Sequence, residues 1–129
     1  MRIIIAGSRG LSGVGLVAQA VAASGWSPSM VISGGARGVD LAAEQWARAQ
    51  GIPSQVVYAD WDTFGRGAGC RRNIVMASMA SALIAIWDGV SPGTAHMVQV
   101  ARQRGLQVFI FRPGPLPQAI QQSLFMFGF

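Results

Sequence analysis

Three glycine-rich segments hold most of the polar residues that could bind a ligand in this chain of 129 residues. They are residues 7–10 (GSRG), 33–40 (SGGARGVD) and 88–94 (DGVSPGT). Each runs into a sequence typical of a helix, and a helix N-terminus presents unpaired N–H groups and a partial positive charge. Because glycine lets a ligand approach the backbone closely, this combination favours binding of an anion such as phosphate.

Residues 88–94 have the clearest local pattern. Ser91 is placed to cap a helix, and Pro92 fits the first helical position. The N–H groups of Gly93 and Thr94 would then face outward beside the Thr94 hydroxyl, as a phosphate-binding turn requires. The alternative is an ordinary capped helix without a ligand, but the convergence of three such segments favours a binding site.

Further candidates flank these segments. Arg71 and Arg72 are adjacent and cannot share one helix face, so we expect one of them to reach the ligand and the other to be solvated. Asp40 could accept hydrogen bonds from ligand hydroxyls or simply complement the helix dipole. The expected ligand-binding set is Gly7, Ser8, Arg9, Gly34, Gly35, Arg37, Asp40, Arg72, Asn73, Asp88, Gly93 and Thr94.

Aromatic side chains near these segments could stack on a base. Trp61 and Phe64 lie in a glycine-flanked stretch and are the better candidates, whereas Trp87 closes a strand and is expected to pack in the core. Cys70 is interpreted as a packing residue at a helix start. His96 is a lone histidine without a nucleophile motif nearby.

The composition excludes several kinds of chemistry. All ten basic residues are arginine, and the net charge is +5. Because the chain has no lysine, it cannot form a P-loop, a Schiff-base site or the ATP site of a kinase. One cysteine and one histidine exclude a structural zinc site and a disulfide framework. Residues 13–18 match a dinucleotide fingerprint in letters but begin too late after the first strand. We expect no cofactor and no metal.

The elements that must position these residues alternate along the chain. Hydrophobic patterning predicts strands over residues 2–6, 29–33, 54–58, 82–87 and 107–112, helices over 11–24, 39–50, 70–80 and 92–104, and a loop over 60–69. This alternation predicts an α/β fold: a Rossmann-like parallel sheet of five strands in the order 3-2-1-4-5, flanked by helices. In such a sheet the ligand binds beyond the carboxyl ends of the strands.

We expect one domain over residues 1–129, with an apolar tail at 116–129 in which Leu116, Ile120 and Leu124 recur at helical spacing. Such a tail packs on its own sheet or on another subunit, so we expect a homo-oligomer. No segment reaches the roughly 18 apolar residues of a membrane span, and a lone cysteine suits a reducing compartment. We therefore expect a cytoplasmic chain without a membrane partner.

Residues 33–40, Arg72 and Asn73 with Met76 and Ala77, and residues 87–94 together resemble the SLOG superfamily. More narrowly, they resemble its short, single-domain YspA-related branch, found in bacteria and phages. The resemblance extends over residues 2–112 and implies a Rossmann-like fold with a nucleotide-type pocket at these segments. The superfamily includes the LOG phosphoribohydrolases, the DprA single-stranded-DNA proteins and sensor domains for nucleotide-derived signals.

The chain departs from the LOG enzymes, whose motif carries a glutamate three residues after its threonine. Met97 stands at that position here, and methionine cannot act as a carboxylate in cleavage of an N-glycosidic bond. Asp40 and Asp88 are the other candidate carboxylates, and the catalytic residue stays unknown. We therefore expect binding of a nucleotide or nucleotide-derived ligand rather than catalysis. The alternatives are a nucleotide N-glycosidase and a DprA-like single-stranded nucleic-acid binder.

Overall fold

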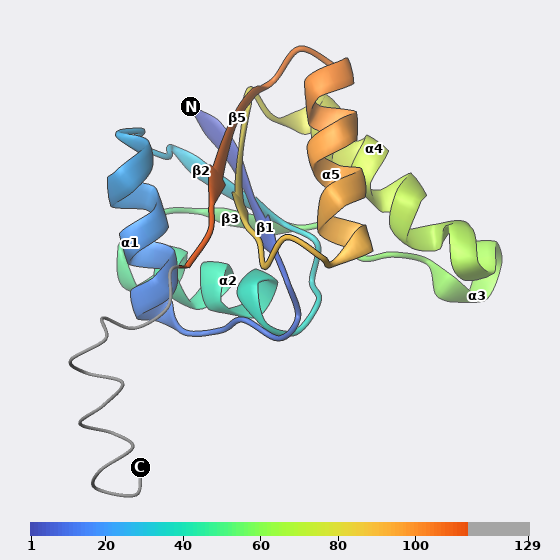
Figure 1. The fold of residues 1–129 in the computed structure, drawn as a ribbon, viewed down its shortest axis with the longest axis horizontal. Helices are drawn as coiled ribbons and strands as arrows, with labels where there is room; N and C mark the ends of the chain where they lie inside the picture. Colours follow the sequence, from blue (N-terminus) through green and yellow to red (C-terminus); the bar gives the residue numbers. More distant parts are fainter. Residues whose placement is uncertain (114–129) are drawn as a thin grey trace, which may run out of the picture.

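The computed structural model describes residues 1–113 and contains one five-stranded parallel sheet (Figure 1). The strand order β3-β2-β1-β4-β5 confirms the predicted Rossmann-like order. The strands are β1 (Arg2–Gly7), β2 (Met30–Ser33), β3 (Ser54–Val56), β4 (Ala82–Ile86) and β5 (Gln107–Phe111). The helices are α1 (Val14–Ser24), α2 (Val39–Ala49), α3 (Trp61–Phe64), α4 (Ala68–Met79) and α5 (Pro92–Gln103), and a 3₁₀ turn, η1, covers Gly65–Gly67.

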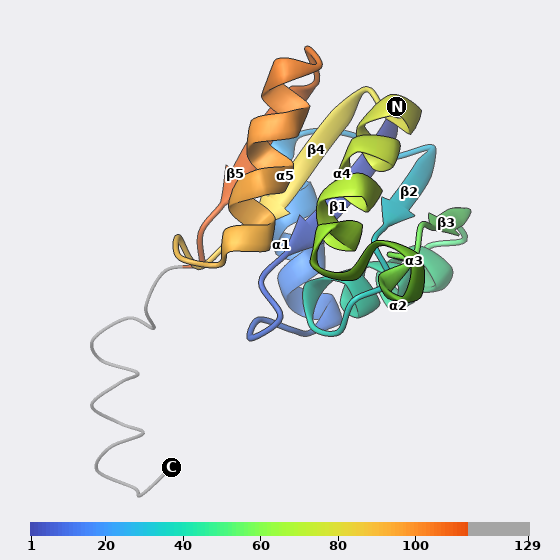
Figure 2. The same ribbon diagram turned by 90° about the vertical axis from the view of Figure 1, so that its right-hand side faces the viewer.

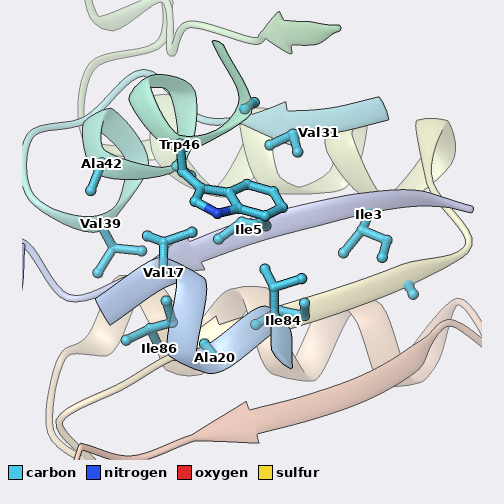
Figure 3. Packing of buried hydrophobic residues seen from close by; sticks show 14 residues of the cluster. Ile3, Ile5, Val17, Ala20, Val31, Val39, Ala42, Trp46, Ile84 and Ile86 are labelled. Carbon is cyan, nitrogen blue, oxygen red and sulfur yellow. The ribbon is translucent and has the colours of Figure 1, made fainter. Parts of the chain in front are cut away.

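Helices cover both faces of the sheet, with α1 and α2 on one face and α4 and α5 on the other (Figures 1 and 2). Successive side chains of the central strand β1 therefore enter different cores. Ile3 and Ile5 pack with Trp46 and the α1 side chains (Figure 3), whereas Ile4 packs with Met76 of α4. Covering on both faces explains why β1 and β4 are almost continuous apolar sequences.

The parallel strands all end at one edge of the sheet, and hydrogen bonds join the loops that follow them. The Ser8 N–H donates to the Ile86 carbonyl at 3.1 Å, and the Asp88 N–H donates to the Ser8 hydroxyl oxygen at 3.1 Å. A Cβ on Gly38 would lie 2.5 Å from the Arg9 carbonyl oxygen, so the loop before α2 packs tightly on the loop after β1. The loops after β1, β2 and β4 thus form one connected layer.

The stretch predicted as a loop over residues 60–69 contains α3, η1 and the start of α4. The Asp60 carboxylate accepts a hydrogen bond from the Thr63 N–H at 3.1 Å and so caps α3. A helix of four residues is too short to show a hydrophobic period, so the prediction was wrong here. The predicted helix over 11–24 also begins later, at Val14.

The predicted apolar tail at 116–129 lies outside the described residues, and the homo-oligomer stays a prediction. Within residues 1–113, no helix has both the length and the apolar character needed to cross a membrane.

Gly7, the last residue of β1, packs closely against β4 and the start of α2. A Cβ at this position would lie 2.2 Å from the Ile86 carbonyl oxygen and 2.8 Å from Val39 Cγ2. We expect Gly7→Ala to lower the free energy of unfolding by about 1–3 kcal/mol through overpacking, measured by urea denaturation. Gly10→Ala is the control, because a Cβ on Gly10 would meet nothing within 4 Å. Equal stability of the two variants would contradict this packing.

Candidate functional site

The N-termini of α4 and α5 lie at the carboxyl edge of the sheet (Figure 2). A pocket of about 390 Å³ is lined by residues from these helix starts and from the loops after β1 and β2. Its size is in the lower part of the range typical of small-molecule sites. The expected ligand-binding residues that line it are Gly7, Ser8, Arg9, Asp40, Arg72, Asn73, Gly93 and Thr94. Gly34, Gly35, Arg37 and Asp88 do not line it.

Asp40, in the first turn of α2, is a carboxylate at the wall of the pocket with only 6% of its surface exposed. Its Oδ2 accepts a hydrogen bond from the Ala36 N–H at 3.2 Å. Among the described residues no hydrogen bond to its Oδ1 is found, and this oxygen is not completely buried. Burial raises the pKa of Asp40 from 3.8 to about 6, against the opposing effects of the Ala36 N–H and of the Arg72 and Arg9 charges. One oxygen thus stays available to a ligand.

Arg72 reaches from α4 to the loop after β2. Its Nη1 donates to the Gly34 carbonyl at 2.5 Å, and its Nε donates to Asn73 Oδ1 at 3.0 Å. A Cβ on Gly34 would lie 2.7 Å from Arg72 Nη1 and 2.9 Å from Asp40 Oδ2. The absence of a side chain at residue 34 therefore makes room for the Arg72 and Asp40 side chains, and does not open space for a phosphate.

Asn73 is buried and links α4 to α5. Because its Oδ1 accepts from Arg72, its Nδ2 faces His96, whose Nδ1 lies 3.0 Å away. His96 Nδ1 then accepts, which places the ring hydrogen on Nε2. From the sequence we predicted no role for His96. The one feature that could have indicated a role is its position one turn into α5. In the fold, His96 fixes the orientation of the amide that holds Arg72.

The N-terminus of α5 forms the opposite wall. Ser91 occupies the predicted cap position but makes no side-chain capping bond, and Pro92 follows in the first turn. Thr94 is 5% exposed and lines the pocket, and no hydrogen bond from its hydroxyl is found in the described part of the chain. A Cβ on Gly93 would meet nothing within 4 Å. Within residues 1–113 the Gly93 and Thr94 N–H groups have no backbone acceptor, so the first turn of α5 offers donors at the pocket.

Asp88 organises the loop between β4 and α5 and lies outside the pocket. Its Oδ1 accepts hydrogen bonds from the Val90 and Ser91 N–H groups, each at 2.8 Å. Its Oδ2 accepts from the Ser91 hydroxyl at 2.8 Å. These bonds lower the pKa of this exposed carboxylate to about 2. Asp88 therefore stays ionised and engaged, which leaves Asp40 as the carboxylate of the site.

Gly35 and Arg37 lie away from the pocket. Gly35 has φ +71°, and a Cβ there would lie 2.6 Å from the Tyr58 ring, so this glycine serves a turn and an aromatic contact. The Arg37 side chain is exposed. Arg9 and Arg72 are thus the arginines that line the cavity. No group of three His, Cys, Asp or Glu side chains that could hold a metal occurs among residues 1–113.

Comparison with known proteins identifies the family. A family model described as "YspA, cpYpsA-related SLOG family" matches residues 1–64. The Gene 61 protein of Mycobacterium phage D29 is 37% identical over 92 residues, which are 67% of this chain and 74% of that protein. The chain belongs to the YspA-related SLOG family.

A solved structure shares the fold of this chain. DNA processing protein A (DprA) from Streptococcus pneumoniae matches with a TM-score of 0.70 and 20% sequence identity. The match covers 98% of this chain and 56% of the DprA chain, so the chain spans little more than half of that protein. At this identity the likeness concerns the fold.

The buried Asp40 carboxyl predicts a pH dependence of stability. Its pKa is higher in the folded chain, about 6, than its ordinary 3.8, so between these values the unfolded chain loses the proton first. Stability therefore falls as the pH rises from about 4 to about 6, by roughly 3 kcal/mol for this group. Asp40→Asn removes this contribution.

We expect the unfolding free energy of Asp40→Asn, relative to that of the unchanged chain, to increase over the same pH range. Urea denaturation of both proteins at several pH values measures this difference. A difference that does not vary with pH would show that Asp40 titrates at its ordinary value in the folded chain.

Proposed function

We propose that the pocket binds a nucleotide or a nucleotide-derived ligand, with its phosphate at the N-terminus of α5 and its sugar hydroxyls toward Asp40. The observation that carries this proposal is the pair of buried polar side chains on opposite walls. Asp40 and Thr94 are 6% and 5% exposed, and within residues 1–113 no hydrogen bond to Asp40 Oδ1 or Thr94 Oγ1 is found. No completely buried side-chain oxygen or nitrogen of residues 1–113 lacks a partner, so these two oxygens are accessible and can bond a polar ligand.

The phosphate end is supported by donors and charge. Gly93 and Thr94, in the first turn of α5, both line the pocket, and a Cβ on Gly93 would enter open space. Arg9 and Arg72 line the same cavity and supply positive charge. A helix N-terminus flanked by guanidinium groups stabilises a bound phosphate.

The sugar end is supported by an acceptor. An ionised carboxylate accepts hydrogen bonds only, and Asp40 Oδ1 suits the hydroxyl groups of a ribose. Asn73 on the adjacent wall has both amide groups engaged, by Arg72 and by His96, so it orients Arg72 instead of bonding a ligand. The pocket thus has hydrogen-bond donors at the start of α5 and a hydrogen-bond acceptor, Asp40, at the start of α2.

Thermal unfolding against adenine and guanine nucleotides, ADP-ribose, cyclic nucleotides and a short DNA oligomer tests the proposal. A ligand at about 100 times its Kd stabilises by roughly 2.7 kcal/mol, which raises the Tm by several degrees. We expect Thr94→Val to weaken nucleotide binding about tenfold or more, because it removes a hydrogen bond to a charged group.

Thr94→Ser keeps the hydroxyl and is the matched control, which we expect to bind as the unchanged chain does. Arg72→Ala is expected to lose binding while the chain still melts cooperatively. If Thr94→Val and Arg72→Ala both bind nucleotides as tightly as the unchanged chain, the ligand lies elsewhere and the proposal fails.

A second candidate function is hydrolysis of a nucleotide N-glycosidic bond, favoured by the position of Asp40. This carboxyl is buried in the pocket with a pKa near 6, a range that suits proton transfer at neutral pH. Asp88, the other candidate, is exposed and held by three hydrogen bonds. If the chain is an enzyme, Asp40 is its catalytic carboxylate.

Incubation with nucleoside monophosphates tests this activity, with chromatographic detection of the released base. If the chain hydrolyses them, we expect Asp40→Asn to lower the rate by at least about a hundredfold, because it removes acid–base catalysis. The same substitution is expected to leave the phosphate contacts in place. Absence of base release from the unchanged chain at excess protein would eliminate the hydrolase candidate.

Binding of single-stranded nucleic acid is the remaining alternative, and the DNA oligomer in the panel addresses it. The structural neighbour is named a DNA processing protein, and several arginines are exposed on this chain. Such binding would weaken steeply with salt concentration. A response to nucleotides without a response to the oligomer favours the small ligand.

A further inference from the structure

Exposed aromatic side chains lie in and just before α3, which precedes α4 in the chain. Tyr58, Trp61 and Phe64 expose 72%, 51% and 44% of their surfaces. Exposed aromatic surface is costly in water and supplies the flat faces on which bases stack. The proposed ligand contains such a base, and the polar walls of the pocket account only for its phosphate and sugar.

The contacts of the aromatic side chains distinguish the one that is available to stack on a base. Phe64 already carries the Arg71 guanidinium over its ring, at 4.2 Å from the ring centroid. Trp87 is half-buried, and its Nε1 donates to the Ser91 carbonyl at 3.1 Å, so it is part of the loop before α5. Tyr58 packs on Gly35, which does not line the pocket. Trp61 is the remaining exposed ring, and the described residues show neither a cation–π contact nor a side-chain hydrogen bond for it.

Trp61 lies beside the pocket wall formed by α4. A Cβ on Gly69 would lie 3.4 Å from Trp61 Cη2 and 3.9 Å from Arg72 Nη2, so the indole and the pocket arginine approach the same point. Gly69, Arg72 and Met76 are spaced three and four residues apart and therefore share one helix face. Arg72 and Met76 on that face line the pocket. The indole thus continues the pocket wall outward from Arg72.

The backbone under Trp61 is held by local bonds. The Asp60 carboxylate caps α3 through the Thr63 N–H at 3.1 Å, and the Asp60 carbonyl accepts from the Phe64 N–H at 3.0 Å. Gly65, with φ +55°, ends the helix and turns the chain into η1 and α4. Trp61 therefore stands at the first position of a capped turn, which lowers the entropy cost of using it as a binding surface.

We propose that Trp61 is the base-binding residue of this site, stacking on the aromatic base of the bound nucleotide and favouring a purine. This inference rests on the proposed function, since it concerns the same ligand. A purine covers more of the indole than a pyrimidine does, and stacking strength follows the buried aromatic area. The Arg72 guanidinium beside the indole contacts the ligand between its base and its phosphate.

Titrations with AMP, CMP and ribose 5-phosphate, followed by calorimetry, test this assignment. We expect the unchanged chain to bind AMP more tightly than CMP, and CMP more tightly than ribose 5-phosphate. Trp61→Ala is expected to weaken AMP binding about 5- to 150-fold, the range that alanine substitution gives for one stacked base, without changing ribose 5-phosphate binding. Trp61→Phe keeps an aromatic face and should retain most of the affinity.

Tryptophan fluorescence gives a second readout. AMP stacked on Trp61 should quench the emission, and Trp61→Phe should abolish the quenching. Trp26→Phe is the matched control, because Trp26 packs against Phe109 on the opposite face of the sheet, and its loss should leave the quenching intact. Phe64→Ala is the binding control, an exposed aromatic of the same helix that is expected to leave AMP affinity unchanged.

The outcomes separate the two proposals. If AMP and ribose 5-phosphate bind equally tightly and Trp61→Ala changes neither, the base-binding role is overturned while the phosphate and sugar site stands. If the unchanged chain binds none of the three compounds and no nucleotide of the thermal-unfolding panel raises its Tm, the proposed function fails, and the role of Trp61 falls with it. A loss of AMP affinity in Phe64→Ala as large as in Trp61→Ala would also overturn the assignment to Trp61.

Discussion

The burial of the Asp40 carboxyl beside Arg72 is the interaction on which the site depends. Removing a carboxylate from water is costly unless donors and opposite charge surround it. Here the Ala36 N–H bonds to Asp40 Oδ2, and the Arg72 guanidinium and Asp40 Oδ2 lie near the same point beside Gly34. The remaining cost appears as the raised pKa of Asp40. A bound ligand that donates a hydrogen bond to the second oxygen would recover part of this cost.

This arrangement connects three separate elements. Asp40 begins α2, Arg72 lies in the second turn of α4, and the carbonyl that Arg72 bonds belongs to the loop after β2. From Arg72, hydrogen bonds continue through Asn73 to His96 in α5. The parallel sheet makes this chain possible, because it brings the starts of α2, α4 and α5 to one edge (Figure 2).

Much of the architecture was predictable because it depends on patterns along the chain. Continuous apolar strands, capping residues and glycine-rich loops fix the strand order and the edge at which a ligand would bind. The orientation of individual side chains was not predictable in this way. Asp88 and Arg72 are both polar residues near glycines, but Asp88 bonds back to its own loop whereas Arg72 crosses to another. Only tertiary packing distinguishes these two environments.

The glycines show the same limit. The sequence predicts the same role for Gly34 and Gly93, namely to let a phosphate approach the backbone. In the fold, a Cβ on Gly34 would collide with Arg72, whereas one on Gly93 would enter open space. The short helix α3 was also not predicted. Its four residues are too few to show a hydrophobic period, and the Asp60 cap stabilises them instead. Local capping and side-chain volume decide these features.

The central claim is that a phosphate binds at the N-terminus of α5, opposite Asp40. Titrating the ¹⁵N-labelled protein with ribose 5-phosphate, and following the backbone amide shifts by NMR, tests it most directly. The account predicts the largest shifts at Gly93 and Thr94, with smaller shifts at Ser8 and Gly10 in the facing loop. Shifts confined to other parts of the sheet, or no shifts at millimolar ligand, would contradict it.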